Sequence, residues 1–206
     1  MTARITATLA AIVRPALVVS GALLATGLGL GAAGVAAGWP LYLAGYASLA
    51  VTLPALAVVH GDRLGRFGRV AFGIATVNAI VGTPVVAMVT TFMLRLDALH
   101  LALMPYAVSP LGVVAAYGMN VSIVLVGIAI VRGGVVPARA GWLLVGAAVL
   151  EYPVEFGLFP FAVGAVAMII VAVAFAWIAR SIPAAPTAPA ARRTAGPSDE
   201  PVGQPA

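Results

Sequence analysis

The sequence predicts an all-α membrane protein, a six-helix transmembrane bundle with both termini in the cytoplasm. Hydrophobic residues make up 63% of the 206-residue chain and charged residues only 8%, whereas soluble globular proteins carry about 25% charged residues. The apolar residues also form long continuous runs, as helices in lipid require, and do not alternate with polar residues as they would in a β-barrel. Finally, arginines cluster between alternate runs, which is typical of a multi-pass protein with a fixed orientation.

Six apolar runs define the expected spans of a bundle at 15–180, at about 15–38, 41–59, 70–94, 107–131, 135–152 and 154–179. Residues 1–14 precede the bundle as a cytoplasmic segment. The first run is longer than the 7–15 apolar residues of a typical signal peptide, but the sequence VAA at 35–37 permits cleavage, so both alternatives stay open. We expect a tight turn at Trp39–Pro40 and a polar loop at His60–Arg69. The Pro- and Ala-rich tail at 181–206 lacks periodic apolar residues and is expected to be disordered.

The arginines predict the orientation of the spans. With a cytoplasmic N-terminus, every arginine except Arg95 falls on the cytoplasmic side, where such residues are enriched. The arginines expected to determine this topology are Arg63, Arg66, Arg69, Arg132 and Arg139. All 11 basic residues are arginine, and with the many Ala, Gly and Val residues this composition is typical of a GC-rich bacterial genome. We therefore expect a multi-pass protein of the bacterial inner membrane. The chain has no basic stripe with interleaved aromatic residues, so its surroundings are the lipid bilayer and not nucleic acid.

Four glycines predict close helix packing. Gly27 and Gly31, and then Gly34 and Gly38, have the GxxxG spacing that lets helix backbones approach one another in membranes. Their partner is either another helix of this chain or a second protomer. GLGAAG at 29–34 also matches the dinucleotide motif GxGxxG, but it lies inside one apolar run and lacks the strand and acidic residue that this motif requires.

Two resemblances to known families carry further expectations. DRLGRFGR at 62–69 resembles the loop between helices two and three of major facilitator transporters, through Asp62, Arg63, Gly65, Arg66 and Arg69, although Val58 stands where that family has a glycine. This resemblance implies a transporter, but six spans would be half of such a carrier. The segments 65–83 and 127–150 resemble small, uncharacterised multi-pass bacterial membrane proteins. That resemblance implies about six helices and no catalytic residues.

Two asparagines occur at membrane depth. Counted from the cytoplasmic ends of the third and fourth spans, Asn78 and Asn120 lie about 12 and 16 Å deep, at similar levels. We expect them to form an interhelical packing contact. The alternative is a polar or ion-binding site at this level.

Two glutamates flank Pro153 at the end of the fifth run. Glu151 lies about 18 Å along a helix from Arg139, short of the far membrane surface. It is either an intramembrane site for a proton or cation or a residue of the outer interface beside Tyr152. Because proline interrupts helices, we expect Pro153 to separate the two glutamates and Glu155 to open the sixth helix. Pro160 is expected to kink that helix.

No catalytic or cofactor site is expected. The chain has no cysteine. His60 and His100 are expected on opposite membrane faces, and Asp97 with His100 gives too few ligands for a metal. We therefore expect no cofactor and no enzymatic activity. The favoured function is that of a membrane subunit, a partner-binding protein or a structural component, whose partner is a second copy or another membrane protein. The alternative is a small oligomeric transporter or ion-coupled carrier that uses Glu151 and the Asn78/Asn120 level.

Overall fold

The protein is all-α throughout the part of the chain that the computed structural model describes, which is residues 2–96, 99, 102–105, 109–134, 136–155 and 157–182. Within these ranges the side chains of 2–5, 62, 111–113, 115, 116 and 155 are not described. The main helices are α1 (Thr2–Ala32), α2 (Gly38–Val59), α3 (Gly61–Met93), α5 (Pro110–Gly133), α6 (Ala138–Glu155) and α7 (Phe161–Ser181). A short helical turn at 102–105 lies between α3 and α5.

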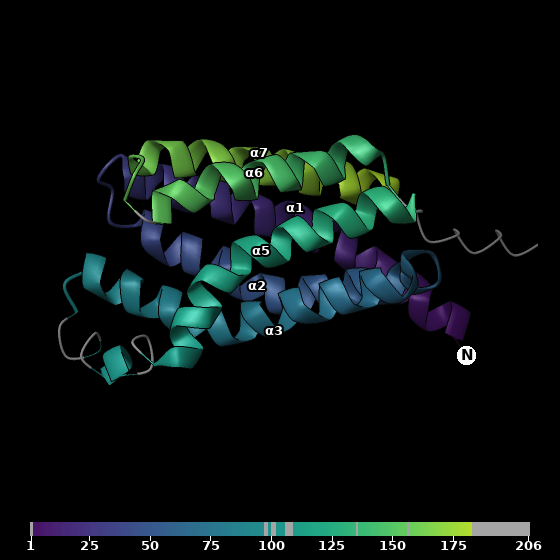
Figure 1. The fold of residues 1–206 in the computed structure, drawn as a ribbon, viewed down its shortest axis with the longest axis horizontal. Helices are drawn as coiled ribbons and strands as arrows, with labels where there is room; N and C mark the ends of the chain where they lie inside the picture. Colours follow the sequence, from purple (N-terminus) through teal and green to yellow (C-terminus); the bar gives the residue numbers. More distant parts are fainter. Residues whose placement is uncertain are drawn as a thin grey trace, which may run out of the picture.

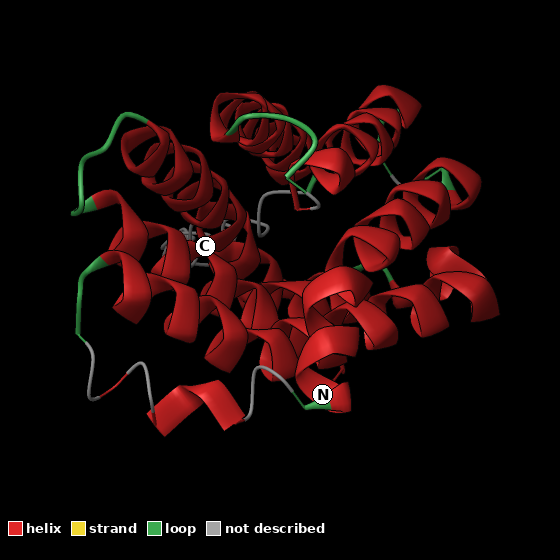
Figure 2. Cartoon of the chain, turned by 60° about the vertical axis from the view of Figure 1, so that its left-hand side comes forward, coloured by secondary structure: helices red, strands yellow, loops and turns green. Residues whose placement is uncertain are grey.

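The six helices form a closed ring. Among the described residues each helix contacts two neighbours, in the order α1, α2, α3, α5, α6, α7 and back to α1. The helices lie along the long axis of the molecule, and successive helices run in opposite directions (Figure 1). Figure 2 shows the same arrangement turned towards the helix ends. Because no helix occupies the centre of the ring, only side chains fill the interior.

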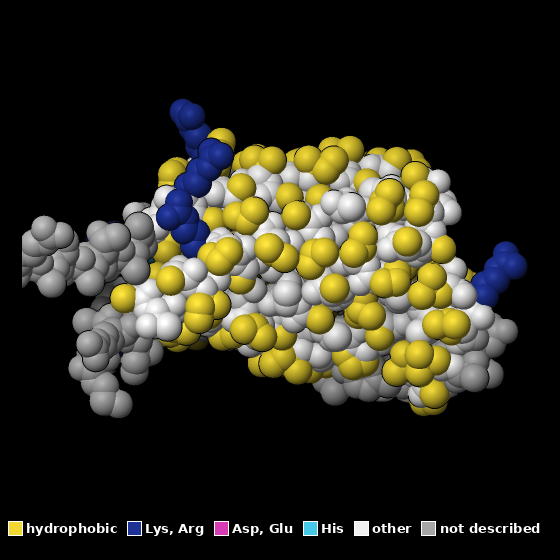
Figure 3. Space-filling model, turned by 180° about the vertical axis from the view of Figure 1, so that it is seen from behind, with side chains coloured by type: hydrophobic (Ala, Val, Ile, Leu, Met, Phe, Trp, Pro, Cys, Tyr) yellow, Lys and Arg dark blue, Asp and Glu magenta, His cyan; other side chains and the backbone are white. Residues whose placement is uncertain are grey.

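Four of these helices, α1, α2, α3 and α7, are long and apolar enough to cross a membrane. Large apolar side chains also cover the outside of the ring: Val51 is 72% exposed, Val77 57% and Ile80 55%. In the view of Figure 3, apolar side chains cover the middle of the molecule and basic side chains lie towards its two ends. This distribution is unfavourable in water and suits a protein surrounded by lipid.

The turn between α1 and α2 is earlier than the sequence suggested. Gly34 has a φ of 80°, and the amide of Val35 donates to the carbonyl of Leu30 at 2.8 Å, which together form a Schellman motif at the end of α1. The predicted turn at Trp39–Pro40 is therefore wrong, because both residues lie in the first turn of α2. Proline is tolerated there since the first amides of a helix have no partner inside it.

The predicted polar loop at 60–69 is also mostly helical. His60 alone separates α2 from α3, which starts at Gly61. The helix is kinked at Gly65, where φ is 62° and ψ is −168°. Arg66 and Arg69 consequently lie in the first turns after the kink and not in a loop, which moves the start of this helix well before the predicted position 70.

The helix α6 continues through Pro153, so the prediction that this proline ends it is wrong. Glu155 is the last residue of α6 and does not open the next helix. The helix stops at Gly157, whose φ is 68°, and the amide of Leu158 closes the end by donating to the carbonyl of Pro153 at 3.0 Å. Pro160 does not kink α7 either, because it is the extended residue that precedes the helix.

Three expectations fall on residues outside the described part of the chain. Asp97, His100 and the tail from position 183 onward all lie outside the described residues. The helix α7 includes Ser181, which the prediction had assigned to the tail.

Candidate functional site

A cavity of about 210 Å³ lies inside the ring, and all six helices line it. It is nearer to the end of the molecule where α1 and α6 finish and where α2 and α7 begin. Its lining residues are Leu28, Trp39, Tyr42, Tyr46, Gly82, Val85, Val86, Val89, Met119, Asn120, Glu151, Val154 and Phe161. The ring therefore leaves room for a small ligand at its centre.

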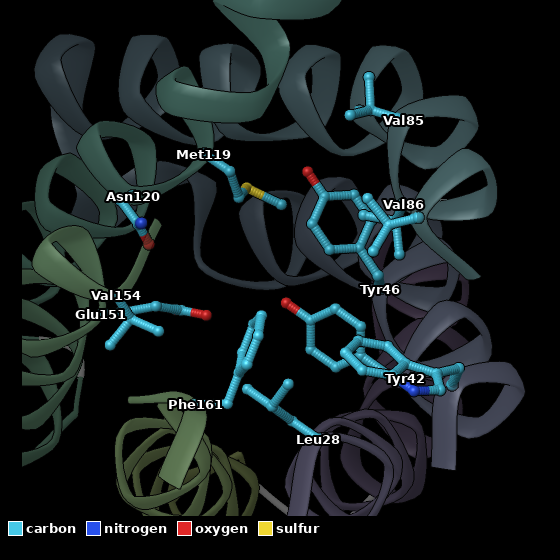
Figure 4. A pocket seen from close by; sticks show the side chains of 13 residues that line it. Leu28, Tyr42, Tyr46, Val85, Val86, Met119, Asn120, Glu151, Val154 and Phe161 are labelled. Atoms are coloured by element: carbon cyan, nitrogen blue, oxygen red, sulfur yellow. The ribbon is translucent and has the colours of Figure 1, made fainter. Parts of the chain in front are cut away.

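The polar groups of the cavity come from three helices. Asn120 of α5 and Glu151 of α6 lie on one side, and Tyr42 and Tyr46 of α2 lie on the other. Figure 4 shows the Glu151 carboxylate and the Tyr42 hydroxyl pointing toward one another across the cavity. Glu151 is the one acidic or basic residue among the described lining residues. An ionisable group placed at membrane depth is by default a functional candidate.

Asn120 is a buried amide with an unused donor. It is 5% exposed, and its Nδ2 is buried without a hydrogen-bond partner. Leaving such a donor unsatisfied costs about 1–3 kcal/mol, so buried polar groups in folded proteins are nearly always paired. A ligand oxygen in the cavity would supply the missing acceptor.

Aromatic rings form the opposite wall of the cavity. The rings of Trp39 and Phe161 meet edge to face, with centroids 6.1 Å apart and an interplanar angle of 84°. Tyr42 and Tyr46 are four residues apart on α2, which places them on one face of that helix. None of these four residues was predicted from the sequence to belong to a site, although the spacing of the two tyrosines indicates a shared helix face.

Two smaller spaces adjoin the cavity. One, of about 40 Å³, shares Tyr42, Tyr46, Met119, Asn120 and Glu151 with it and extends towards the middle of the ring. The other, of about 190 Å³, is a groove between α5 and α6 that also reaches Asn120. Its lining includes Val121 and Val149, which are 53% and 61% exposed on the outside of the ring. Asn120 thus lies between the lipid-facing groove and the interior.

The two asparagines do not share one site. The Nδ2 of Asn78 donates to the Oγ of Ser122 at 2.6 Å and to the carbonyl of Gly118 at 3.1 Å. These bonds join α3 to α5. On α5, Asn120 lies two residues from each of the residues that accept these bonds, and it lines the cavity towards α6. Asn78 is not among the residues that line the cavity.

Three of the four singled-out glycines lie where α1 and α2 meet. A Cβ at Gly27 would collide with the backbone of Tyr42, and one at Gly38 with the carbonyl oxygen of Gly27. Gly31 faces the Trp39 ring, 3.0 Å from where its Cβ would be. Gly34 is not in a helix: it is the left-handed residue of the turn.

The arginines singled out for topology lie at the end of the ring away from the cavity. All five are exposed, and they occupy the start of α3, the end of α5 and the start of α6: Arg63, Arg66, Arg69, Arg132 and Arg139. The guanidinium of Arg132 lies 5.2 Å above the Phe67 ring and so links α5 to α3. Among the described residues, more arginines lie at this end than at the other.

His60 lies in the short connection at this arginine-rich end. Its Nε2 is buried and makes no hydrogen bond. Burial, and after it the positive charge of Arg63, lower the pKa of His60 below its ordinary value of 6.5. The neutral imidazole is therefore the favoured form in the folded protein.

Comparison with known proteins gives no family assignment. No protein-family model, curated protein or solved structure matches the chain. In the part of the chain that the structure describes, no three His, Cys, Asp or Glu side chains are grouped so as to hold a metal ion.

Proposed function

We propose that this protein is a small carrier of the bacterial inner membrane that binds a solute or ion in its central cavity. Its six helices cross the membrane with both termini in the cytoplasm, so that the cavity lies in the outer half of the bilayer. Glu151 supplies the charge of the site, and Asn120 supplies a hydrogen-bond donor. The lipid bilayer surrounds the ring. The proposed carrier needs no enzymatic step.

One observation carries this proposal: a carboxylate and an unsatisfied amide line one cavity inside a ring of membrane helices. Polar groups in this setting are costly, and they commonly mark the paths of substrates and ions. A purely structural subunit has no need for such a cavity, since apolar side chains would fill the space at lower cost. Of the four glycines that the sequence singled out for helix packing, Gly27 and Gly31 contact α2, and Gly38 contacts α1.

The order of the helices supports a carrier further. The units α1–α2–α3 and α5–α6–α7 have the same sequence of contacts, and α1 and α5 run in opposite directions (Figure 1). Many transporters consist of two inverted repeats with the substrate site between them. In each unit, the first helix is followed by a left-handed glycine, Gly34 with φ 80° and Gly134 with φ 57°. In each unit, the second helix carries a proline near its end, Pro54 and Pro153.

The first two helices of both units also approach each other at a glycine. A Cβ at Gly127 would lie 2.6 Å from the carbonyl oxygen of Gly141 on α6, just as one at Gly27 would meet the backbone of Tyr42 on α2. The close contacts of α1 with α2 and of α5 with α6 are thus made in the same way, 100 residues apart in the sequence. We take the two units as the halves that move against each other during transport.

Cysteine accessibility tests the carrier, because the chain has no cysteine of its own. Val86 lines the cavity and suits a Val86→Cys reporter. In sealed vesicles of either orientation, we expect an impermeant, charged thiol reagent to label this cysteine from both sides of the membrane. Ile80→Cys on the same helix is the matched control, because this residue is 55% exposed on the lipid-facing surface and should not react.

Labelling from both sides at position 86, without labelling at position 80, supports alternating access to the cavity. If position 86 reacts from neither side, the cavity holds no water path and the carrier proposal is wrong. Labelling from one side alone would make the protein a binding protein without transport, which also contradicts a carrier.

A further inference from the structure

We infer that the cavity binds a small alkylammonium ion that also carries a hydroxyl or another hydrogen-bond acceptor. This inference rests on the proposed function and names the class of its solute. It follows from three features of the wall: one carboxylate, a set of aromatic rings and an orphaned amide donor.

The negative charge of Glu151 determines that the ligand is a cation. Glu151 is the one charged residue among the described lining residues, so the wall itself carries a negative charge. An anionic ligand would be repelled by the carboxylate in this poorly solvated space, whereas a monovalent cation would pair with it. Arg95 follows α3 at the same end of the ring as the cavity, but it is exposed and does not line the cavity, and the other described arginines lie towards the opposite end.

The aromatic wall determines the kind of cation. Trp39, Tyr42, Tyr46 and Phe161 all border the cavity, and Trp39 and Phe161 are in edge-to-face contact. The faces of such rings attract ammonium groups, and aromatic cages of this kind recognise alkylated ammonium ions. A strongly hydrated metal cation would instead need several oxygen ligands, and the described wall offers a single carboxylate. Alkyl groups on the nitrogen suit the valines and the leucine that complete the lining.

Asn120 determines the second group of the ligand. Its Nδ2 is buried without a partner, so it requires an acceptor that an ammonium group cannot provide. A hydroxyl oxygen on the same ligand would accept this bond while the ammonium lies between Glu151 and the rings. At about 210 Å³ the cavity is smaller than the usual range of about 300–1,000 Å³ for drug-sized ligands, so the ligand is small.

The groove between α5 and α6 gives this ligand a route from the membrane interface. It reaches Asn120 from the lipid-facing side, and Tyr152 and Pro153 lie along it. A cation with alkyl groups partitions into the interface, where Tyr side chains are also favoured. Asn120 is then the first polar group of the interior that the ligand meets.

Equilibrium binding of radiolabelled choline tests the inference, with the full chain purified into lipid nanodiscs. Choline carries the alkylated ammonium and the hydroxyl, and 3,3-dimethylbutan-1-ol is its uncharged isostere with carbon in place of nitrogen. We expect choline to bind and tetramethylammonium to displace it. The neutral isostere should compete at least about tenfold more weakly, which corresponds to about 1.4 kcal/mol.

Variants assign the binding to the cavity. Glu151→Gln should weaken choline binding at least about tenfold, and Glu151→Asp, which keeps the charge, should bind more tightly than Glu151→Gln. Phe161→Leu should weaken choline binding about threefold or more, since it removes a ring from the wall. Glu155→Gln is the matched control, because it removes the same charge from the same helix, and it should leave binding unchanged. Thermal unfolding of each variant verifies that it is folded.

Several results would overturn the inference. Equal competition by choline and its neutral isostere means that the site selects shape and not charge. Unchanged affinity in Glu151→Gln, or an equal loss in Glu155→Gln, places the charge effect outside the cavity. If choline does not bind while Val86→Cys reacts from both sides, the cation class is wrong and the carrier remains. If Val86→Cys reacts from neither side, the proposed function itself fails, whatever the choline result.

Discussion

Substituting alanine for Gly27 tests whether the ring depends on the close contact between α1 and α2. A Cβ at this position would meet the backbone of Tyr42, with the Cα of Tyr42 2.6 Å away. Ordinary contacts of a Cβ begin at 3.4 Å. Because the obstacle is backbone and not the end of a flexible side chain, the two helices must separate by about 1 Å.

The expected cost follows from this geometry. Overpacking of a well-packed interior costs about 1–3 kcal/mol, and a clash with backbone belongs at the upper end of that range. Alanine also favours the helix over glycine by about 0.5–1 kcal/mol, which offsets part of the cost. We therefore expect Gly27→Ala to lower the free energy of unfolding by about 2 kcal/mol. Tyr42 lines the cavity, so ligand binding should weaken as well.

Gly29→Ala is the matched control on the same helix. No atom lies within 4 Å of where its Cβ would be, so only the gain in helix preference of about 0.5–1 kcal/mol remains. Denaturant unfolding in detergent micelles, followed by tryptophan fluorescence, measures both variants against the parent protein. Equal stability of the two variants would show that α1 and α2 do not approach closely at Gly27, and the packing described for this half of the ring would be wrong.

Three further predictions concern the other elements. Gly127→Ala should destabilise the protein by about 2 kcal/mol, as Gly27→Ala does. Gly146→Ala should not destabilise it, because the space around Gly146 is open, and the same unfolding assay compares the two variants. Asn78→Leu should lower stability by about 0.6–1.7 kcal/mol, because it removes the hydrogen bonds from α3 to α5, and an unchanged denaturation midpoint would contradict this. Because the pKa of His60 is lowered in the folded protein, its imidazole takes up a proton at a higher pH in the unfolded chain than in the folded one. The free energy of unfolding should therefore fall as the pH drops below 6.5 and through the folded-state pKa. Unfolding measured between pH 8 and pH 5, about the range in which histidine titrates, should show a smaller decline in His60→Gln.

The helical membrane class could be predicted because composition and continuous apolar runs determine it directly. Helix ends were harder, and the errors share one cause. Pro40 and Pro153 were taken as helix stops, but Pro40 lies in the first turn, where the amide has no partner inside the helix. Pro153 removes one hydrogen bond only two residues before the end of α6. The actual ends are at Gly34 and Gly157, which take the left-handed conformation that closes a helix. In glycine-rich apolar sequence these two glycines do not stand out.

The candidate site was predictable in part. Span length alone made Glu151 suspect, since it is too close to Arg139 to reach the far surface by a full span. The predicted depths of Asn78 and Asn120 come from residue counting and stay a prediction, and the roles of the two residues could not be derived in that way. Depth follows from residue counting, whereas the direction of a side chain depends on how each helix is rotated towards its neighbours. The aromatic wall remained unforeseen for the same reason.

The two halves of the ring use their polar groups differently, and this difference indicates where a ligand binds. In the α1–α2 half, Ser48 donates to Ser20 at 2.6 Å, Ser20 donates to the carbonyl of Ala16 at 2.8 Å, and Thr52 donates to the carbonyl of Ser48 at 2.7 Å. The corresponding positions of the α5–α6 half, about 100 residues later, hold Asn120 and Glu151. The hydroxyl cluster satisfies its own donors, whereas the Nδ2 of Asn120 is buried without a partner in a residue that lines the cavity. The seam between α5 and α6 has an unused donor and a carboxylate, and it is therefore the seam at which we propose that the ligand binds.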